Sequence, residues 1–127
     1  MVGVLEKAWS PLSVTDIDRI YGDAFCKTDN AITGIGNNVT IEYTDMDFGE
    51  KTCVVIEITG RSPIEKNTIH VRTSNGINET LNIAEFPYSD DYATKRFPVN
   101  VLSGSQTVTL LFLPGSNFDL KGIRFVR

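Results

Sequence analysis

The chain has 127 residues and a formal net charge of −4, with 41% hydrophobic and 22% charged residues, as expected of one globular domain spanning 1–127. Its basic residues are scattered, with no run longer than Lys95-Arg96, which argues against the clustered Lys and Arg that nucleic acid requires. No apolar stretch approaches the roughly 18 to 20 residues of a membrane helix. We therefore expect neither nucleic acid nor a membrane as a partner.

Segments of strand length, separated by turn residues, follow one another along the chain, and helical periodicity is nearly absent. Within residues 52–59 apolar side chains alternate with more polar ones, so that one face of the strand points toward a core. Strands are expected at residues 5–9, 24–28, 39–43, 52–59, 68–72, 80–85, 95–99, 107–113 and 122–126. The pattern predicts an all-β fold, a β-sandwich of eight or nine strands.

Two local signals interrupt this pattern. Residues 14–20 are compatible with a short helical turn, for which Ser13 or Thr15 would be the cap. Asn75-Gly76 predicts a tight type I′ turn between two strands, because both central positions of that turn need a positive φ.

Two cysteines, Cys26 and Cys53, are too few to define a disulfide framework, and their spacing fits no zinc motif. Cys53 begins an apolar run and is expected to be a buried core thiol. Whether it pairs with Cys26 depends on a geometry that the sequence does not define, so the redox compartment stays open.

Catalytic chemistry finds little support in the sequence. His70 is the only histidine, and it lies in the middle of an expected strand, where an exposed or groove-facing position is typical. A Ser-His-Asp or Cys-His arrangement would have to use it, and zinc chemistry would need several His and Cys ligands. Most carboxylates lie in turns or at polar strand positions. We therefore expect a protein that is not an enzyme.

The C-terminal run reads as two strands joined by a short loop. Residues 107–113 form the first apolar run, and Pro114-Gly115-Ser116 interrupts it. Asn117 and Asp119 then precede the last strand. A loop at the end of a rigid sheet is a favourable place for a binding site.

Several segments, in this order, resemble carbohydrate-binding module family 6. The matching segments are residues 34–43, 47–49, 67–72, 108–112, 117–119 and 123–125. The chain is especially similar to accessory modules of bacterial family 2 glycoside hydrolases, such as β-galactosidases. That similarity lies in residues 19–23, 60–63 and 112–119.

The resemblance implies a jelly-roll β-sandwich of two antiparallel sheets that binds sugar without cleaving it. Its partners would be an oligosaccharide or polysaccharide and, in cis, the catalytic domain of the parent enzyme. Such an enzyme is more often secreted or held at the cell surface, although the sequence leaves the compartment open.

The resemblance also implies a sugar site at the loop end. Asn117 would hydrogen-bond adjacent hydroxyls through its amide. The stacking aromatic would be Tyr92, with Tyr88 as the other candidate. The loop that normally supplies a second aromatic contains Asn37 and no aromatic, which weakens the site. Arg61 is a further candidate contact, for a sugar hydroxyl or a uronic acid.

Other assignments stay open at this stage. The segment that begins at Arg61 and ends at Asn67 is either a binding loop or a polar hairpin whose turn is set by Pro63. Trp9 is either a second platform or part of the core.

Family members also have a second sugar site on a concave sheet face. Polar strand positions such as Glu57, His70 and Arg72 are candidates for it.

The family often holds a structural Ca²⁺, for which the resemblance implies Asp119 together with Asp16, Asp18 or Asp23. Calcium accepts mixed carboxylate and carbonyl oxygens. The alternative for Asp119 is that it caps a turn through backbone amides. The rival hypothesis for the whole domain is a structural or interdomain module that has lost sugar binding.

Overall fold

The computed structural model of the chain describes residues 7–127. Its strands are β1 Leu12–Ser13, β2 Arg19–Tyr21, β3 Cys26–Lys27, β4 Ile32–Ile35, β5 Val39–Asp47, β6 Cys53–Arg61, β7 Lys66–Ser74, β8 Glu79–Pro87, β9 Ala93–Asn100, β10 Ser105–Phe112 and β11 Phe118–Val126. No helix in these residues is long and apolar enough to cross a membrane.

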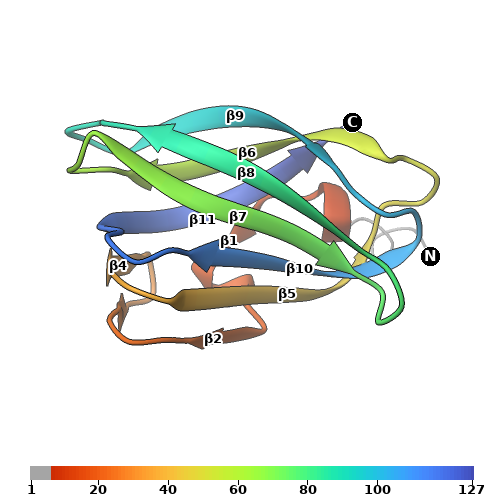
Figure 1. Cartoon of the computed structure of the whole chain (residues 1–127), viewed down its shortest axis with the longest axis horizontal. Coiled ribbons are helices and arrows are strands. Elements are labelled where there is room, and N and C mark those ends of the chain that lie inside the picture. Colours follow the sequence, from red (N-terminus) through yellow and green to blue (C-terminus); the bar gives the residue numbers. More distant parts are fainter. Residues whose placement is uncertain (1–6) are drawn as a thin grey trace.

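The strands form two antiparallel sheets that pack face to face (Figure 1). One sheet has the order β3-β4-β11-β6-β9, with β1 paired to β11, and the other has the order β2-β5-β10-β7-β8. The predicted all-β jelly-roll sandwich of two antiparallel sheets is confirmed.

Along the long strands, side chains alternate strictly between the core and the surface, and those that point inward form the core between the sheets. Val54, Ile56 and Ile58 of β6 point inward and are almost fully buried, as are Ile69 and Val71 of β7. Five phenylalanines also lie in the core: Phe48, Phe86, Phe112, Phe118 and Phe125. Each such side chain contributes about 1.5 to 3 kcal/mol by leaving water, so the core supplies most of the driving force for this fold.

Eight of the nine predicted strands overlap an observed strand. The exception is residues 5–9, of which 5 and 6 lie outside the described residues and 7–9 form a 3₁₀ turn. Three short strands, β1, β2 and β4, were not predicted and bring the described total to eleven. They have between two and four residues each, which is too few for an alternating pattern to be recognised.

Trp9 packs against the core, in agreement with the second of the two alternatives for it. Its ring lies edge-on to Phe48, with centroids 5.5 Å apart. The guanidinium carbon of Arg127 lies 4.5 Å from the centroid of the same ring. The first and last parts of the described chain therefore meet at one end of the sandwich.

The helical turn predicted near residue 14 is present as η2, Val14–Asp16, with Ser13 at its N-cap. The backbone N–H of Ser13 donates to Oδ2 of Asp16, at 2.8 Å. The turn is shorter than predicted, because Arg19–Tyr21 already belongs to β2.

The connection from β7 to β8 is not a type I′ turn. Gly76 has a φ of 90°, but Asn38 and Asp45 are the only other described residues with positive φ besides glycines. Instead Oδ1 of Asn75 accepts from the backbone N–H groups of Ile77 and Asn78, at 2.9 and 2.8 Å. The side chain of Asn75 thus closes a longer loop.

The prediction of a buried Cys53 is wrong. Cys53 and Cys26 are both exposed free thiols. Because Val54 points into the core at the start of β6, alternation directs Cys53 outward, and its Sγ lies 3.4 Å from Oδ1 of Asn100.

The edge strands β8 and β9 of the two sheets are bridged by one side chain. The Nδ2 of Asn82 donates to the carbonyl of Asn100 at 2.7 Å, and Oδ1 of Asn82 accepts from the N–H of Asn100 at 3.0 Å.

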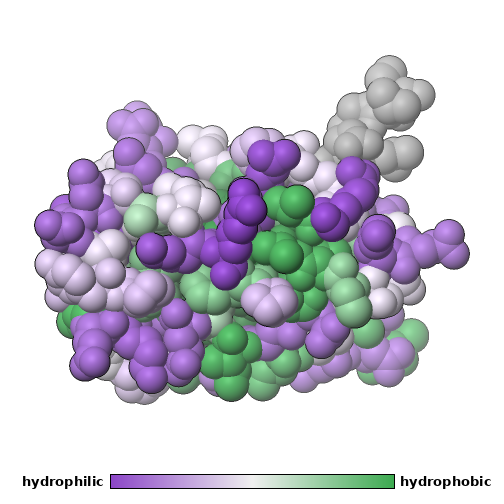
Figure 2. All heavy atoms as spheres, turned by 90° about the horizontal axis from the view of Figure 1, so that it is seen from above, coloured by the Kyte–Doolittle hydropathy of each residue, from purple (hydrophilic) through white to green (hydrophobic). Residues whose placement is uncertain are grey.

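Figure 2 views the molecule from the side of β8 and β9 and shows apolar atoms gathered near its centre. Leu81 and Ile83 of β8 are exposed to 52% and 60%.

Gly60 of β6 leaves room for the ring of Phe118, from the start of the neighbouring strand β11. A Cβ at this position would collide with the ring of Phe118 and lie 2.6 Å from the carbonyl oxygen of Asp119. We expect Gly60→Ala to lower the free energy of unfolding by about 2 kcal/mol or more, because the packed backbone has to move. Urea unfolding followed by fluorescence measures this loss.

Gly104→Ala is the control for this prediction. Gly104 has a φ of 82°, and no atom lies near its missing Cβ. Strain alone should cost about 1 kcal/mol there. Equal losses for both variants would contradict the role given to the close approach.

Candidate functional site

Four connections between strands meet at one end of the sandwich, the end at the left of Figure 1. They are residues 36–38, 62–65, 88–92 and 113–117. The C-terminus lies at the other end. All five residues predicted to contact sugar lie in these connections or directly beside them, so the fold brings them to a common region.

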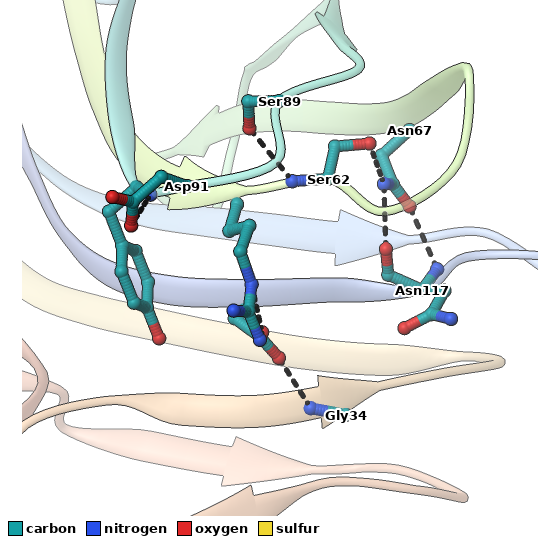
Figure 3. Close-up of polar contacts among 9 residues, drawn as sticks. Gly34, Ser62, Asn67, Ser89, Asp91 and Asn117 are labelled. Atoms are coloured by element: carbon teal, nitrogen blue, oxygen red, sulfur yellow. Dashed lines mark hydrogen bonds and ion pairs between the residues drawn. The ribbon is translucent and has the colours of Figure 1, made fainter.

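A buried carboxylate joins three strands at this end. Asp119 of β11 is only 6% exposed. Its Oδ2 accepts from Nε and Nη2 of Arg61 in β6, at 3.0 and 2.5 Å, and its Oδ1 accepts from the N–H of Gly34 in β4, at 2.9 Å (Figure 3). The hydrogen bonds and charge of Asp119 raise the pKa of Arg61, so the guanidinium stays charged. The capping alternative for Asp119 is thus correct in part, with Arg61 as an additional partner.

Tyr92 lies beside this pair and is half-buried. The Nζ of Lys121 lies 4.5 Å from the centroid of its ring, and the guanidinium carbon of Arg61 lies 5.6 Å from it. Burial, followed by the charge of Asp119, raises the pKa of the phenol, which is therefore neutral at physiological pH. The predicted stacking ring is present, but two cations share it.

The side-chain amide of Asn67 holds the backbone of Asn117 (Figure 3). Its Nδ2 donates to the carbonyl of Asn117 and its Oδ1 accepts from the N–H of Asn117, both at 2.9 Å. Asn67 is 1% exposed, and its Nδ2 also donates to Oγ of Ser62 at 2.7 Å. These bonds fix Asn117, whose own amide points away from Asn67 and is exposed.

Two further predicted contacts belong to the same end. Oδ1 of Asn37 accepts from the N–H of Gly115 at 2.7 Å and so fastens the connection that carries Asn117. Tyr88 is 57% exposed, and its N–H donates to the carbonyl of Glu65 at 2.9 Å. Tyr88 thus stands on the surface of this end.

The second aromatic of a sugar clamp is missing here, as expected from the sequence. In the connection where it would occur, Ile32 and Ile35 are fully buried in the core and Asn37 is engaged with Gly115. Stacking at this site therefore has to use Tyr92 or Tyr88, without a ring from that connection.

For Asn67 the structural alternative of the segment from Arg61 to Asn67 holds, because its amide is buried and used within the protein. Lys121 was not foreseen as part of the site. It lies where the pairing of β11 with β6 shifts register between Leu120 and Gly122, and no local sequence pattern signals such a bulge.

The residues proposed for a sheet-face site do not share one face. Glu57 lies in β6 of the six-stranded sheet, where it pairs with Arg96 at 2.9 Å. His70 and Arg72 lie in β7 of the five-stranded sheet and are half-buried. Only His70 and Arg72 remain candidates for a common surface.

The predicted calcium ligands are engaged by protein groups. Oδ2 of Asp18 accepts from Nζ of Lys7 at 3.0 Å and from the N–H of Thr44 at 2.8 Å. Burial raises the pKa of Asp18, but these hydrogen bonds outweigh it, and the pKa lies below its usual value. Asp16 accepts from the N–H of Ser13.

These contacts do not fit a shared calcium site. Arg61 supplies positive charge to Asp119, and Lys7 supplies it to Asp18. Within residues 7–127, no group of three or more His, Cys, Asp or Glu side chains could hold a metal ion. The structure therefore does not bring Asp16, Asp18 and Asp119 together around an ion.

No protein-family model matches the chain, and no curated protein matches it in sequence. Solved structures are similar in fold. One is the CBM6 domain CsCBM6-3 from Clostridium stercorarium in complex with cellobiose, with a TM-score of 0.79, 19% identity, and coverage of 94% of this chain and 95% of that one. Another is a β-1,3-glucan-binding CBM6 from Bacillus halodurans, with a TM-score of 0.77, 19% identity, and coverage of 94% and 97%.

A third similar structure is a longer enzyme. It is a glycoside hydrolase family 43 arabinoxylan arabinofuranohydrolase from Bacillus subtilis in complex with cellotetraose, with a TM-score of 0.74 and 17% identity. The match covers 94% of this chain but 27% of the enzyme. At these identities the similarities establish a shared fold.

Removal of the Asn67 amide should loosen the loop end. We expect Asn67→Ala to lower the free energy of unfolding by about 2 to 3 kcal/mol, because Ser62 and the backbone of Asn117 lose buried hydrogen-bond partners. Amide hydrogen exchange should show faster exchange at Asn117. Unchanged exchange there would mean that Asn67 does not hold the loop.

Calcium should not change the stability of the domain, because Arg61 and Lys7 already neutralise Asp119 and Asp18. We expect melting temperatures in millimolar CaCl₂ and in EDTA to agree within about 1 °C. A melting temperature that rises steadily with calcium concentration would reveal an ion site made by other groups.

Proposed function

We propose that this domain is a non-catalytic carbohydrate-binding module that holds a parent glycoside hydrolase, secreted or at the cell surface, on an oligosaccharide or polysaccharide. The observation that carries the proposal is the exposed amide of Asn117, fixed by Asn67 at the same end of the sandwich as Tyr92. The cellobiose and β-1,3-glucan named for the similar structures support this ligand class. The arabinofuranohydrolase supports a parent enzyme, because the shared fold is a minor part of its chain.

Binding at this site would use few, well-placed groups. The carboxamide of Asn117 both donates and accepts, so it suits two adjacent hydroxyls of one sugar. An apolar sugar face would stack on the part of the Tyr92 ring that Lys121 and Arg61 leave open. Because Asn67 orders the loop before binding, less conformational entropy is lost on association.

The same geometry disfavours catalysis by this domain. Asp119 and Arg61 neutralise each other, and both are tied into the strands. The one histidine, His70, lies in the middle of β7 in the other sheet. Neither Asp119 nor His70 is therefore placed to act as an acid or base at this site, and the domain would act by binding.

A second candidate function is that of a structural module that packs against a neighbouring domain. It is favoured by the exposed Leu81 and Ile83 of β8 and by the cations that cover part of Tyr92. In that case, replacing Leu81 and Ile83 with serine would expose the linker of the full-length protein to limited proteolysis, and the isolated domain would bind no glycan.

The primary proposal predicts sugar binding that depends on Asn117. In NMR titrations with oligosaccharides from cellulose, xylan, β-1,3-glucan and pectin, we expect shifts centred on Asn117 and Tyr92. Asn117→Ala should reduce affinity for the bound sugar about tenfold or more, since hydrogen bonds to two hydroxyls are lost.

Asn78→Ala is the matched control, because Asn78 is exposed in the loop between β7 and β8. It should bind like the wild type. Shifts confined to His70 and Arg72 would move the site to the sheet face, and no shifts with any sugar would favour the structural module.

A further inference from the structure

A groove of about 470 Å³ runs along the outer face of the six-stranded sheet, next to the loop-end site. Its floor contains Thr59, Thr94 and Glu57, and the segment 11–16 forms a wall. Lys121 belongs to both places, because it lines the groove and lies over the ring of Tyr92. The groove is therefore continuous with the region proposed to bind sugar.

Two cations in this groove have no carboxylate partner. Lys121 and Arg124 both line it, and within residues 7–127 neither side chain forms an ion pair. Both residues are exposed, so their charges face the ligand space rather than the core.

The carboxylates of the groove, in contrast, are already engaged. Oε2 of Glu57 accepts from Nε of Arg96 at 2.9 Å, and Oδ2 of Asp16 accepts from the N–H of Ser13 at 2.8 Å. Arg96, which lies outside the groove lining, neutralises Glu57, whereas the N–H of Ser13 leaves the charge of Asp16 in place. Lys121 and Arg124 therefore exceed the remaining carboxylate by one positive charge, on a chain whose net charge is −4. The unpaired charge of the groove is thus positive.

Hydroxyl groups complete the lining. The Oγ1 atoms of Thr59 and Thr94 lie 2.7 Å apart and share one hydrogen bond, which leaves acceptor capacity on both for a polyol. A surface with paired hydroxyls and unpaired cations fits a sugar that carries an anionic group.

We propose that this groove binds an acidic sugar, carrying a carboxylate or a sulfate, in a glycan whose neighbouring unit occupies the site at Tyr92 and Asn117. This inference rests on the proposed function and adds the class of glycan. Lys121 and Arg124 would pair with the anionic group, while the two threonines hydrogen-bond hydroxyls of the same ring.

Two matched pairs of ligands test the charge requirement by calorimetry. Trigalacturonate is compared with its methyl ester, and κ-neocarratetraose sulfate with the same tetrasaccharide after desulfation. We expect at least one acidic member to bind about tenfold more tightly than its neutral partner, and to weaken as NaCl is raised. The pair that shows the preference identifies carboxylate or sulfate.

Charge-removing variants test the location. Lys121→Gln and Arg124→Gln should each reduce affinity for the acidic ligand about tenfold, and Arg124→Gln, which lies away from the Tyr92 ring, should leave affinity for its neutral partner unchanged. Lys121→Arg should restore binding. Lys51→Gln removes the same charge from an exposed position in the turn before β6 and should have no effect. Unchanged melting temperatures would exclude unfolding as the cause.

The outcomes separate the two proposals. The groove proposal would be overturned by equal affinity for acidic and neutral ligands. It would also be overturned if neither variant changed the affinity for the acidic ligand. Either result would leave the proposal of sugar binding at Asn117 intact. Absence of binding by every sugar, including those in the neutral panel, would overturn both.

Discussion

The buried carboxylate of Asp119 is the constraint around which the loop end is arranged. A charge withdrawn from water is tolerated only with hydrogen-bond partners, and Asp119 finds them in Arg61 of β6 and Gly34 of β4. Satisfying this one group ties three strands together. The same ion pair also holds Arg61 beside Tyr92. The need to satisfy a buried carboxylate therefore determines which side chain lies next to the ring on the surface.

Much of the fold follows from the sequence, because burial between two sheets imposes a period of two. The long strands β6 and β7 alternate without interruption and are recognised at once. Strands such as β1 and β2 are set by pairing with β11 and β5, partners remote in sequence, and carry no pattern of their own. The same period places Cys53 outside, against the hydrophobicity of its run.

The candidate site was predictable in its location and less so in its contacts. Tyr92 and Asn117 precede β9 and β11, which are both antiparallel to β6 and so start at the same end of one sheet. Their location at a common end therefore follows from strand order and the family resemblance. The partner of Asp119 could not be predicted from the sequence, because a buried carboxylate can pair with an ion, an arginine or a backbone amide. Lys121 depends on a register shift in β11, which only the paired backbone reveals.

The contact of Arg127 with Trp9 places both ends of the described chain at the pole opposite the loops. A polypeptide that continues from Arg127 would leave from that pole, away from the loop end. Such a domain could swivel about a single pivot while presenting its loops outward. For a ligand fixed on a surface, rebinding would then be governed by linker length and stiffness through the local concentration of the loops.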